Sequence, residues 1–317
     1  MASKRRDSST TGEVCKQMVV SKNKPDWLGM RLTLTDEFKE VKQTLRELGI
    51  VTVCEEAHCP NIPECWSGGT ATFMVLGDTC TRGCRFCHVK KRIRGQPVDE
   101  KEPEKLAEAV KRWKLDYIVV TSVDRDDLPD QGAQHFAKCI KKLKEQDILV
   151  EVLIPDFRGN IECLRIISAA GPDVIAHNIE TVERLQKKVR DPRAGYKQSL
   201  EVLESVKKIN PKIYTKSSIM LGLGETQEEV EQAMQDLRET GVDFITLGQY
   251  LRPSERQVEV QEYVKPEIFK KYEQLANKLG FKYAAAGPFV RSSYRAGELF
   301  IKNMLKKEEV YATAQHR

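Results

Sequence analysis

Three cysteines lie in the run Cys80-Thr81-Arg82-Gly83-Cys84-Arg85-Phe86-Cys87, and no fourth Cys or His follows at the spacing of a zinc finger. We call Cys80, Cys84 and Cys87 the loop triplet. Three thiolates can hold three irons of a [4Fe–4S] cube and leave the fourth iron open, whereas electron-transfer clusters usually take four Cys. An open coordination position distinguishes a reactive metal site from a structural one. The run therefore predicts a cluster that binds a substrate or cofactor; a three-Cys zinc site and a chance pattern are the alternatives.

A second group of cysteines lies just upstream. Cys54, Cys59 and Cys65, the upstream triplet, have a C-x4-C-x5-C spacing that is too loose for a zinc knuckle and again supply only three thiolates. Two incomplete ligand sets favour two clusters over one site of six Cys. Of the remaining cysteines, Cys139 and Cys163 fall in amphipathic helical patterns, and we expect them to be small buried hydrophobic residues.

The loop triplet, with Phe86 before its last Cys, resembles the cluster loop of the radical S-adenosylmethionine (SAM) superfamily. Together with the upstream run from Cys54 to Trp66, it resembles the lipoyl synthase family within that superfamily. The resemblance covers roughly residues 25 to 300. The other matching segments are Asp126-Asp127-Leu128-Pro129-Asp130, Leu153-Ile154-Pro155-Asp156-Phe157, His177-Asn178-Ile179-Glu180-Thr181, Leu221-Gly222-Leu223-Gly224-Glu225-Thr226, Gln249-Tyr250-Leu251-Arg252-Pro253 and Arg291-Ser292-Ser293-Tyr294.

This resemblance implies a chemistry and its cofactors. In that family the open iron of the loop-triplet cluster chelates SAM, and one electron cleaves SAM to a 5′-deoxyadenosyl radical. The radical abstracts hydrogen from a protein-bound octanoyl chain, and a second [4Fe–4S] cluster on the upstream triplet donates sulfur at C6 and C8. No protein side chain can break such a C–H bond, so the cofactors supply the reactivity and the protein supplies orientation and exclusion of water.

The resemblance also implies partners, and it leaves rivals open. The partners are octanoylated lipoyl-carrier domains (E2 subunits of 2-oxoacid dehydrogenases and the glycine cleavage H protein), a low-potential electron donor and an iron–sulfur carrier. A biotin-synthase-like or methylthiotransferase-like enzyme shares the loop triplet but not the upstream spacing or the terminal Arg-Ser-Ser-Tyr. A ferredoxin-like relay is the alternative for the upstream cluster, although one Cys is missing for it. A non-catalytic iron–sulfur or zinc scaffold is the alternative from another class.

From about residue 70, short apolar runs alternate with helical patterns. Nearly continuous apolar runs are typical of parallel strands that are covered on both faces. A helical pattern at 226–239 begins with a capping box at Thr226-Gln227-Glu228-Glu229 and ends before Gly241. We expect strands at 71–76, 117–122, 149–154, 174–178, 213–221 and 244–249, a helix at 35–48 and a final strand at 282–289. Six successive βα units predict a parallel α/β sheet, either open or curled into a barrel.

The polar motifs choose between these two architectures. The loop triplet, Asp124-Arg125-Asp126-Asp127, Asn178 with Glu180, and Gln249-Tyr250 all follow predicted strands. Such motifs mark the active face of a βα barrel, whereas a doubly wound sheet concentrates its site at one switch point. We therefore predict a partial (β/α)6 barrel at residues 70–280. An N-terminal tail and extension with the upstream triplet occupies 1–69, and a C-terminal strand, serine motif and tail occupy 281–317.

Several polar residues are candidates for binding SAM. Asn178 and Glu180 are two apart on a predicted strand and so face the same side, where an amide and a carboxylate suit the methionyl group and ribose of SAM. Ser122 ends a predicted strand, and Arg190, Lys216 and Arg252 are candidates for contacts with SAM or substrate; an ordinary surface or ion-pair role is the alternative for these three. We expect His58 and His88, which flank cysteines, to lie beside the clusters and not on them.

Ser292 is a candidate ligand for the upstream cluster, which needs a group on its fourth iron that can leave with sulfur. A serine oxygen is a harder and less usual iron ligand than a thiolate and so suits a labile position. The resemblance assigns this role to the first Ser of the motif, Ser292, and leaves Ser293 as the cap of a helix that would start at Tyr294.

Composition indicates an ordinary globular protein, with 40% hydrophobic and 31% charged residues. The net charge of +5 is modest, and no basic patch is interleaved with aromatic residues, so nucleic-acid binding is not expected, while an acidic protein partner is compatible. No apolar run is long enough to span a bilayer, so we expect no membrane association. Met1-Ala2-Ser3-Lys4-Arg5-Arg6 leads into polar residues and not into an apolar signal core; a transit peptide is the alternative that we do not favour for this tail. An odd number of cysteines in clusters indicates reduced thiols, and we expect a cytoplasmic protein.

Overall fold

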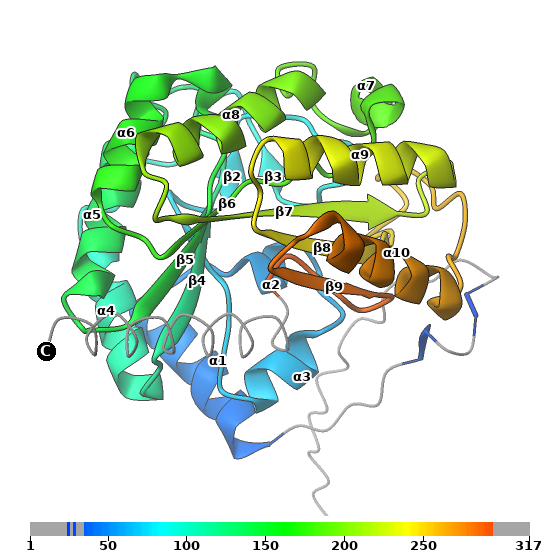
Figure 1. Cartoon of the computed structure of the whole chain (residues 1–317). Helices are drawn as coiled ribbons and strands as arrows, with labels where there is room; N and C mark the ends of the chain where they lie inside the picture. Colours follow the sequence, from blue (N-terminus) through cyan, green and yellow to red (C-terminus); the bar gives the residue numbers. More distant parts are fainter. Residues whose placement is uncertain (1–23, 26–27, 30–34, 294–317) are drawn as a thin grey trace, which may run out of the picture.

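A parallel sheet organises the structure, which is a computed structural model that describes residues 24–25, 28–29 and 35–293. Within these residues seven strands pair in the order β1-β4-β5-β6-β7-β8-β9, each parallel to its neighbours (Figure 1). Parallel neighbours require a crossover connection between consecutive strands. The strands are β1 (Phe73–Val75), β4 (Tyr117–Ser122), β5 (Leu149–Leu153), β6 (Val174–Ala176), β7 (Tyr214–Leu221), β8 (Phe244–Gln249) and β9 (Tyr283–Gly287).

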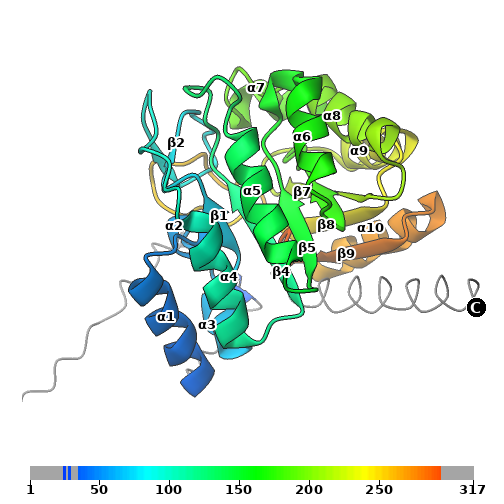
Figure 2. The same cartoon turned by 90° about the vertical axis from the view of Figure 1, so that its left-hand side faces the viewer.

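Helices cover the outer side of this curved sheet (Figures 1 and 2). They are α4 (Glu102–Trp113), α5 (Ala133–Lys144), α6 (Ile161–Ala169), α8 (Tyr196–Ile209), α9 (Gln227–Glu239) and α10 (Pro266–Leu279). Among the described strands β1 pairs only with β4, apart from an isolated bridge between Phe73 and Thr52, and β9 pairs only with β8, so the sheet curls without closing. The predicted partial α/β barrel is confirmed, and each predicted strand is present.

Local sequence signals explain where these helices begin and end. In α9 the Thr226 hydroxyl accepts the Glu229 N–H while the Glu229 carboxylate accepts the Thr226 N–H, which is the predicted capping box. Gly280 ends α10 in the left-handed conformation that glycine adopts without a steric penalty. Pro103 lies in the first turn of α4, where its missing N–H has no intrahelical partner to lose.

An N-terminal extension precedes the sheet. It contains α1 (Asp36–Leu48) and two short helices, α2 (Val53–Glu56) and α3 (Ile62–Ser67). Helix α1 matches the helix predicted at 35–48, and the Thr35 hydroxyl caps its N-terminus. The sequence did not predict α2 and α3, because helices of four and six residues are too short to show a hydrophobic period. Helix α1 packs against α3 and α4, so the extension rests on the first βα unit.

Short elements at the carboxyl ends of the strands complete the fold. They are β2 (Thr79–Cys80), β3 (Lys90–Lys91), η2 (Phe157–Gly159), η3 (Glu183–Leu185) and α7 (Gln186–Val189). In the described residues no helix combines the length and the apolar composition that crossing a bilayer requires.

Candidate functional site

A cavity of ≈ 370 Å³ opens at the carboxyl ends of the strands, within the size range of small-molecule sites. All six cysteines of the two triplets line it, although the upstream triplet precedes the sheet and the loop triplet follows β1. Ser122, Asn178, Glu180, Arg190 and Ser292 line the same cavity. The fold therefore brings together residues from both ends of the chain and from three strand ends.

Backbone hydrogen bonds hold the loop triplet against three neighbouring segments. Thr81 N–H donates to the Asp124 carbonyl beyond β4 at 3.0 Å, and Arg85 N–H donates to the Val189 carbonyl at the end of α7 at 2.8 Å. The Arg85 carbonyl in turn accepts the Val258 N–H at 3.0 Å. Each contact satisfies a polar group that would otherwise be buried without a partner, so the loop has a defined conformation.

One residue of this loop, Arg82, is a buried arginine. The Arg82 side chain is only 3% exposed, and its guanidinium reaches the carboxylates of Asp126 (2.9 Å) and Asp156 (2.7 Å) as well as that of Asp124 (3.2 Å). Burial alone would raise the pKa of Asp156, but the hydrogen bonds and charge of Arg82 hold that pKa at about 2. Sequence reasoning gave Arg82 no role; the signal that could have found it is a cation inside the loop triplet together with aspartates after two strands.

Arginine and aspartate side chains extend this network over the loop. Asp191 accepts the Gly83 N–H at 2.6 Å, and Arg193 donates to the Thr81 carbonyl at 2.7 Å. Arg193 also forms an ion pair with Asp191 at 2.8 Å. This ion pair hydrogen-bonds the loop backbone at both Thr81 and Gly83, and the network therefore anchors the backbone of the loop at these two residues.

The upstream triplet is held by the C-terminal segment. Asn61, beside α3, donates to the Phe289 carbonyl at 2.7 Å, and the Thr72 hydroxyl donates to the Ser293 hydroxyl at 2.9 Å. Ser293 is thereby engaged, whereas the Ser292 hydroxyl has no hydrogen-bond partner among the described residues and lies at the cavity. This difference supports Ser292 over Ser293 as the labile ligand. The helix predicted after Ser293 lies outside the described residues.

Both triplets are too widely spread for a single metal ion. In the described part of the chain, only Glu102, His135 and Cys139 bring three ligand atoms within 4.8 Å of one another. Neither cysteine triplet does so, which disfavours the three-Cys zinc site and suits a cube of four irons, whose ligands are farther apart. None of the six thiols is in a disulfide bond. Burial raises the pKa of Cys84 to about 12, so iron must displace its proton.

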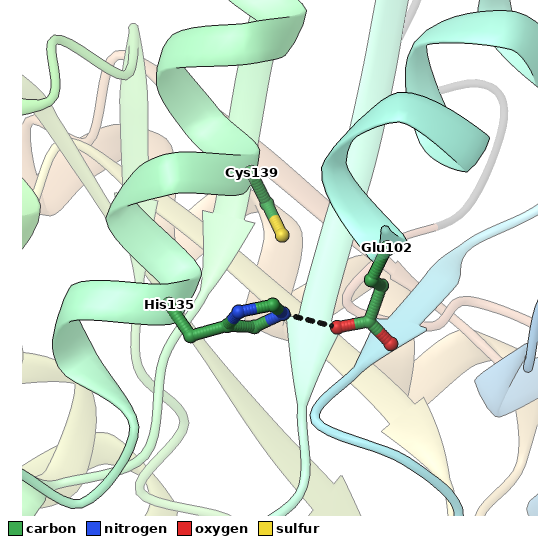
Figure 3. Close-up of side chains that lie close together, drawn as sticks. All are labelled: Glu102, His135 and Cys139. Carbon is green, nitrogen blue, oxygen red and sulfur yellow. Dashed lines mark hydrogen bonds and ion pairs between the residues drawn. The ribbon is translucent and has the colours of Figure 1, made fainter. Parts of the chain in front are cut away.

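The compact cluster of Glu102, His135 and Cys139 lies between α4 and α5 and is not part of the cavity (Figure 3). The Glu102 carboxylate accepts the Leu76 N–H at 3.0 Å and bonds the His135 ring at 2.8 Å. Cys139 is fully buried beside them, which confirms its predicted role as a small hydrophobic residue. These contacts give the three residues a structural role, because they join both helices to the end of β1.

Unpartnered polar atoms indicate where a ligand fits. The Ser122 hydroxyl and the Asn178 side-chain carbonyl are buried without a hydrogen-bond partner, and both residues line the cavity. Such atoms are costly unless a ligand or water satisfies them. Glu180 accepts the Asn178 amide at 3.2 Å, and its φ of +66° is unusual for a residue with a side chain. The carbonyl and hydroxyl can accept and donate to the polar groups of SAM.

Three basic residues that the sequence predicted to contact SAM or substrate have partners within the protein. Lys216 is 1% exposed, lies outside the cavity and donates to Glu151 at 2.7 Å, so the predicted contact with SAM does not fit its position. Arg252 also lies outside the cavity lining and donates to the Gln257 carbonyl at 2.9 Å. Arg190 lines the cavity, but one of its guanidinium nitrogens donates to Ser199 at 2.8 Å. Lys216 lies in the first half of β7 (Tyr214–Leu221), away from the carboxyl end of the strand, where the cavity opens.

The two histidines beside the triplets contact each other. The rings of His58 and His88 are 3.8 Å apart between centroids, and the His88 ring bonds the Glu56 carbonyl at 3.0 Å. Both residues line the cavity. Their position between the triplets agrees with a place beside the clusters.

The sequence matches two family models. Residues 74–237 match the radical SAM superfamily, and residues 2–59 match the N-terminal domain of lipoyl synthase of the radical SAM family. A protein of Branchiostoma floridae named "Lipoyl synthase, mitochondrial" is 56% identical over 296 residues, which are 91% of this chain and 79% of the relative. A protein of the same name from Culex quinquefasciatus is 57% identical over 298 residues, 92% of this chain and 78% of the relative.

Solved structures share the fold at low identity. The FeFe-hydrogenase maturase HydG from Carboxydothermus hydrogenoformans aligns with a TM-score of 0.53 at 13% identity and covers 84% of this chain and 78% of its own. Methylornithine synthase (PylB) aligns with a TM-score of 0.51 at 12% identity and covers 81% of this chain and 82% of its own. At this identity the likeness supports the fold alone.

The predicted cytoplasmic location is wrong, because the relatives are named as mitochondrial proteins. Reduced cysteines indicate a reducing compartment but do not distinguish one such compartment from another.

Proposed function

Because the chain belongs to the lipoyl synthase family of the radical SAM superfamily, we propose that it inserts two sulfur atoms, at C6 and C8, into an octanoyl chain carried on a lysine of a partner protein. The observation that carries this mechanism is the cavity that both cysteine triplets share with the candidate SAM residues. When bound, a [4Fe–4S] cluster with SAM supplies the radical, and a second cluster supplies the sulfur.

In this proposal the two cysteine triplets have different roles. The loop triplet holds the SAM-binding cluster, and the upstream triplet with Ser292 holds the sulfur-donating cluster. Arg82 and its aspartates keep the first set of thiols in place, while Asn61 and Thr72 tie the second set to the C-terminal segment. Because both cysteine triplets are anchored to the same barrel, the two clusters that they would hold stay at a constant separation.

The SAM site that we propose uses Asn178, Glu180, Ser122 and Arg190. The buried amide and hydroxyl acceptors orient the polar groups of SAM, and the Glu180 carboxylate suits the ribose hydroxyls or the amino group. Burial raises the pKa of Glu180, and the Arg190 charge opposes that rise only in part. We propose that the positive charge of bound SAM further stabilises the Glu180 carboxylate.

We further propose octanoylated lipoyl-carrier domains as the substrates, a low-potential electron donor and an iron–sulfur carrier as the other partners, and a mitochondrial location. The first is the substrate class that the family name carries, and the last follows from the names of the relatives. The boundaries 1–69, 70–280 and 281–317 remain our proposal for the division of the chain.

An anaerobic assay with an octanoyl-lysine peptide, SAM and a strong reductant tests this function. The wild-type protein should bind about eight irons and release lipoyl product with 5′-deoxyadenosine. Alanine at all three loop-triplet positions should abolish SAM cleavage, whereas alanine at all three upstream positions should preserve cleavage and abolish sulfur transfer. Cys163→Ala, a buried cysteine away from the cavity, is the matched control. Loss of SAM cleavage in a folded upstream variant would contradict the division of work.

A further inference from the structure

One exposed apolar side chain distinguishes the surface next to the loop triplet. Ile93 is 92% exposed, and the other large hydrophobic residue on the surface of the described chain, Ile161, is only 39% exposed. At 92% exposure the Ile93 side chain buries almost no apolar area within this chain. It gains free energy only when another molecule covers it.

Unpaired cations flank Ile93. Arg92 and Arg94 are its neighbours in the chain, and Arg85 follows Cys84, whose carbonyl accepts the Lys91 amine at 2.7 Å; all three arginines are exposed. Within the described residues none of these three guanidinium groups has a hydrogen-bond or ion-pair partner. Exposed cations on the helices of the barrel, in contrast, are commonly paired with a nearby carboxylate, as in Arg112 with Glu108 and Arg165 with Glu162. The patch therefore carries positive charge that the chain itself does not neutralise.

This patch lies at the mouth of the cavity. Strand β3 pairs with β2, which ends at Cys80, and the Arg92 N–H donates to the Cys80 carbonyl at 3.0 Å. The Lys91 amine donates to the Cys84 carbonyl at 2.7 Å, and Lys91 itself lines the cavity. A molecule that covers Ile93 is thus held next to the loop triplet.

We propose that Arg85, Arg92, Ile93 and Arg94 form the docking surface for an acidic protein domain that presents the octanoylated lysine. The inference rests on the proposed function, in which the acyl chain is attached to a protein and must enter the cavity from its mouth. A lysine arm reaches inward only if its domain rests beside the opening. Unpaired arginines steer an acidic partner toward this surface, and the apolar side chain in their midst supplies the contact that becomes dry on binding.

The test compares two substrates of the same enzyme. One is a short, uncharged octanoyl-lysine peptide, and the other is an octanoylated lipoyl-carrier domain with a negative net charge. Arg92→Glu/Arg94→Glu should raise KM for the carrier domain about tenfold or more at low salt, because charge reversal slows the association that opposite charge accelerates. Turnover of the peptide, SAM cleavage and iron content should not change. Added salt should reduce the difference between variant and wild type.

Two further variants separate charge from hydrophobic contact. Arg92→Gln/Arg94→Gln removes half as much charge and should give an intermediate KM. Ile93→Ser should raise KM for the carrier domain about tenfold with little salt dependence, as expected for the loss of one apolar contact at an interface. Lys212→Glu/Lys278→Glu is the matched control, because it makes the same charge change on exposed residues before β7 and β9, at the opposite end of the strands.

The outcomes distinguish this inference from the proposed function. Unchanged KM for the carrier domain in the Arg92/Arg94 variants, or an equal effect of the Lys212/Lys278 control, would overturn the docking surface. A parallel loss of peptide turnover would also overturn it, because the loop would then serve the loop triplet. Failure of the wild-type protein to convert the peptide would instead refute the proposed function.

Discussion

Replacing Arg82 with methionine should destabilise the protein strongly, although Arg82 is not a proposed ligand of metal or SAM. Methionine keeps an unbranched apolar stem but leaves Asp126 (4% exposed) and Asp156 (0% exposed) without their buried cation. Removal of one partner from a buried ion pair costs about 3–5 kcal/mol. With an unfolding entropy of about 2.1 cal/mol/K per residue over 317 residues, this cost lowers Tm by roughly 4–8 °C.

The control for this prediction is another arginine on the same carboxylate. Arg158 donates to Asp126 at 2.9 Å but is 51% exposed, and an exposed pair contributes only about 0–1 kcal/mol. Arg158→Gln should therefore lower Tm by less than about 2 °C. Thermal unfolding by circular dichroism under anaerobic conditions, with iron content measured in parallel, gives both values. Equal shifts in the two variants would refute the argument that burial of Arg82 gives the network its strength.

The remaining predictions concern the cavity. Asn178→Ala and Glu180→Ala should weaken SAM binding, measured by calorimetry, and leave iron content unchanged; unchanged affinity in both would make these residues structural. Ser292→Ala should keep SAM cleavage and lose lipoyl product, and Ser292→Cys should bind the cluster but release sulfur poorly, whereas full activity of Ser292→Ala would exclude the ligand role. Burial, with the Arg190 charge, lowers the pKa of His177 to about 4, so the unfolded chain binds an extra proton between pH 4 and 6.5 and stability falls as pH decreases through that window. His177 should thus contribute a loss of about 1 kcal/mol between pH 7.5 and 5.5, and urea titrations of His177→Gln should lack this slope.

Much of the fold was predictable because its signals are local. Apolar runs predicted the strands, and Thr226 with Glu229 predicted the start of α9, since each depends on residues a few positions apart. The strand predicted over 174–178 ends earlier, at Ala176, although the His177 N–H still donates to the Lys216 carbonyl of β7 at 3.0 Å. Helices α2 and α3 were not predicted because four and six residues are too few to show a repeating hydrophobic period.

The candidate site depended on both levels. Cysteine spacing within a few residues determined the two triplets and the reactive character of the loop, because ligand number and spacing are properties of the chain itself. Only the tertiary structure decided which distant groups meet there: Thr72 hydrogen-bonds Ser293 across 221 positions, and Arg82 reaches Asp156 across 74. The tertiary structure also shows that Lys216 lies outside the cavity, because its buried amine is paired with the Glu151 carboxylate. Contacts between segments so far apart follow from the curvature of the sheet, and no local pattern in the sequence encodes it.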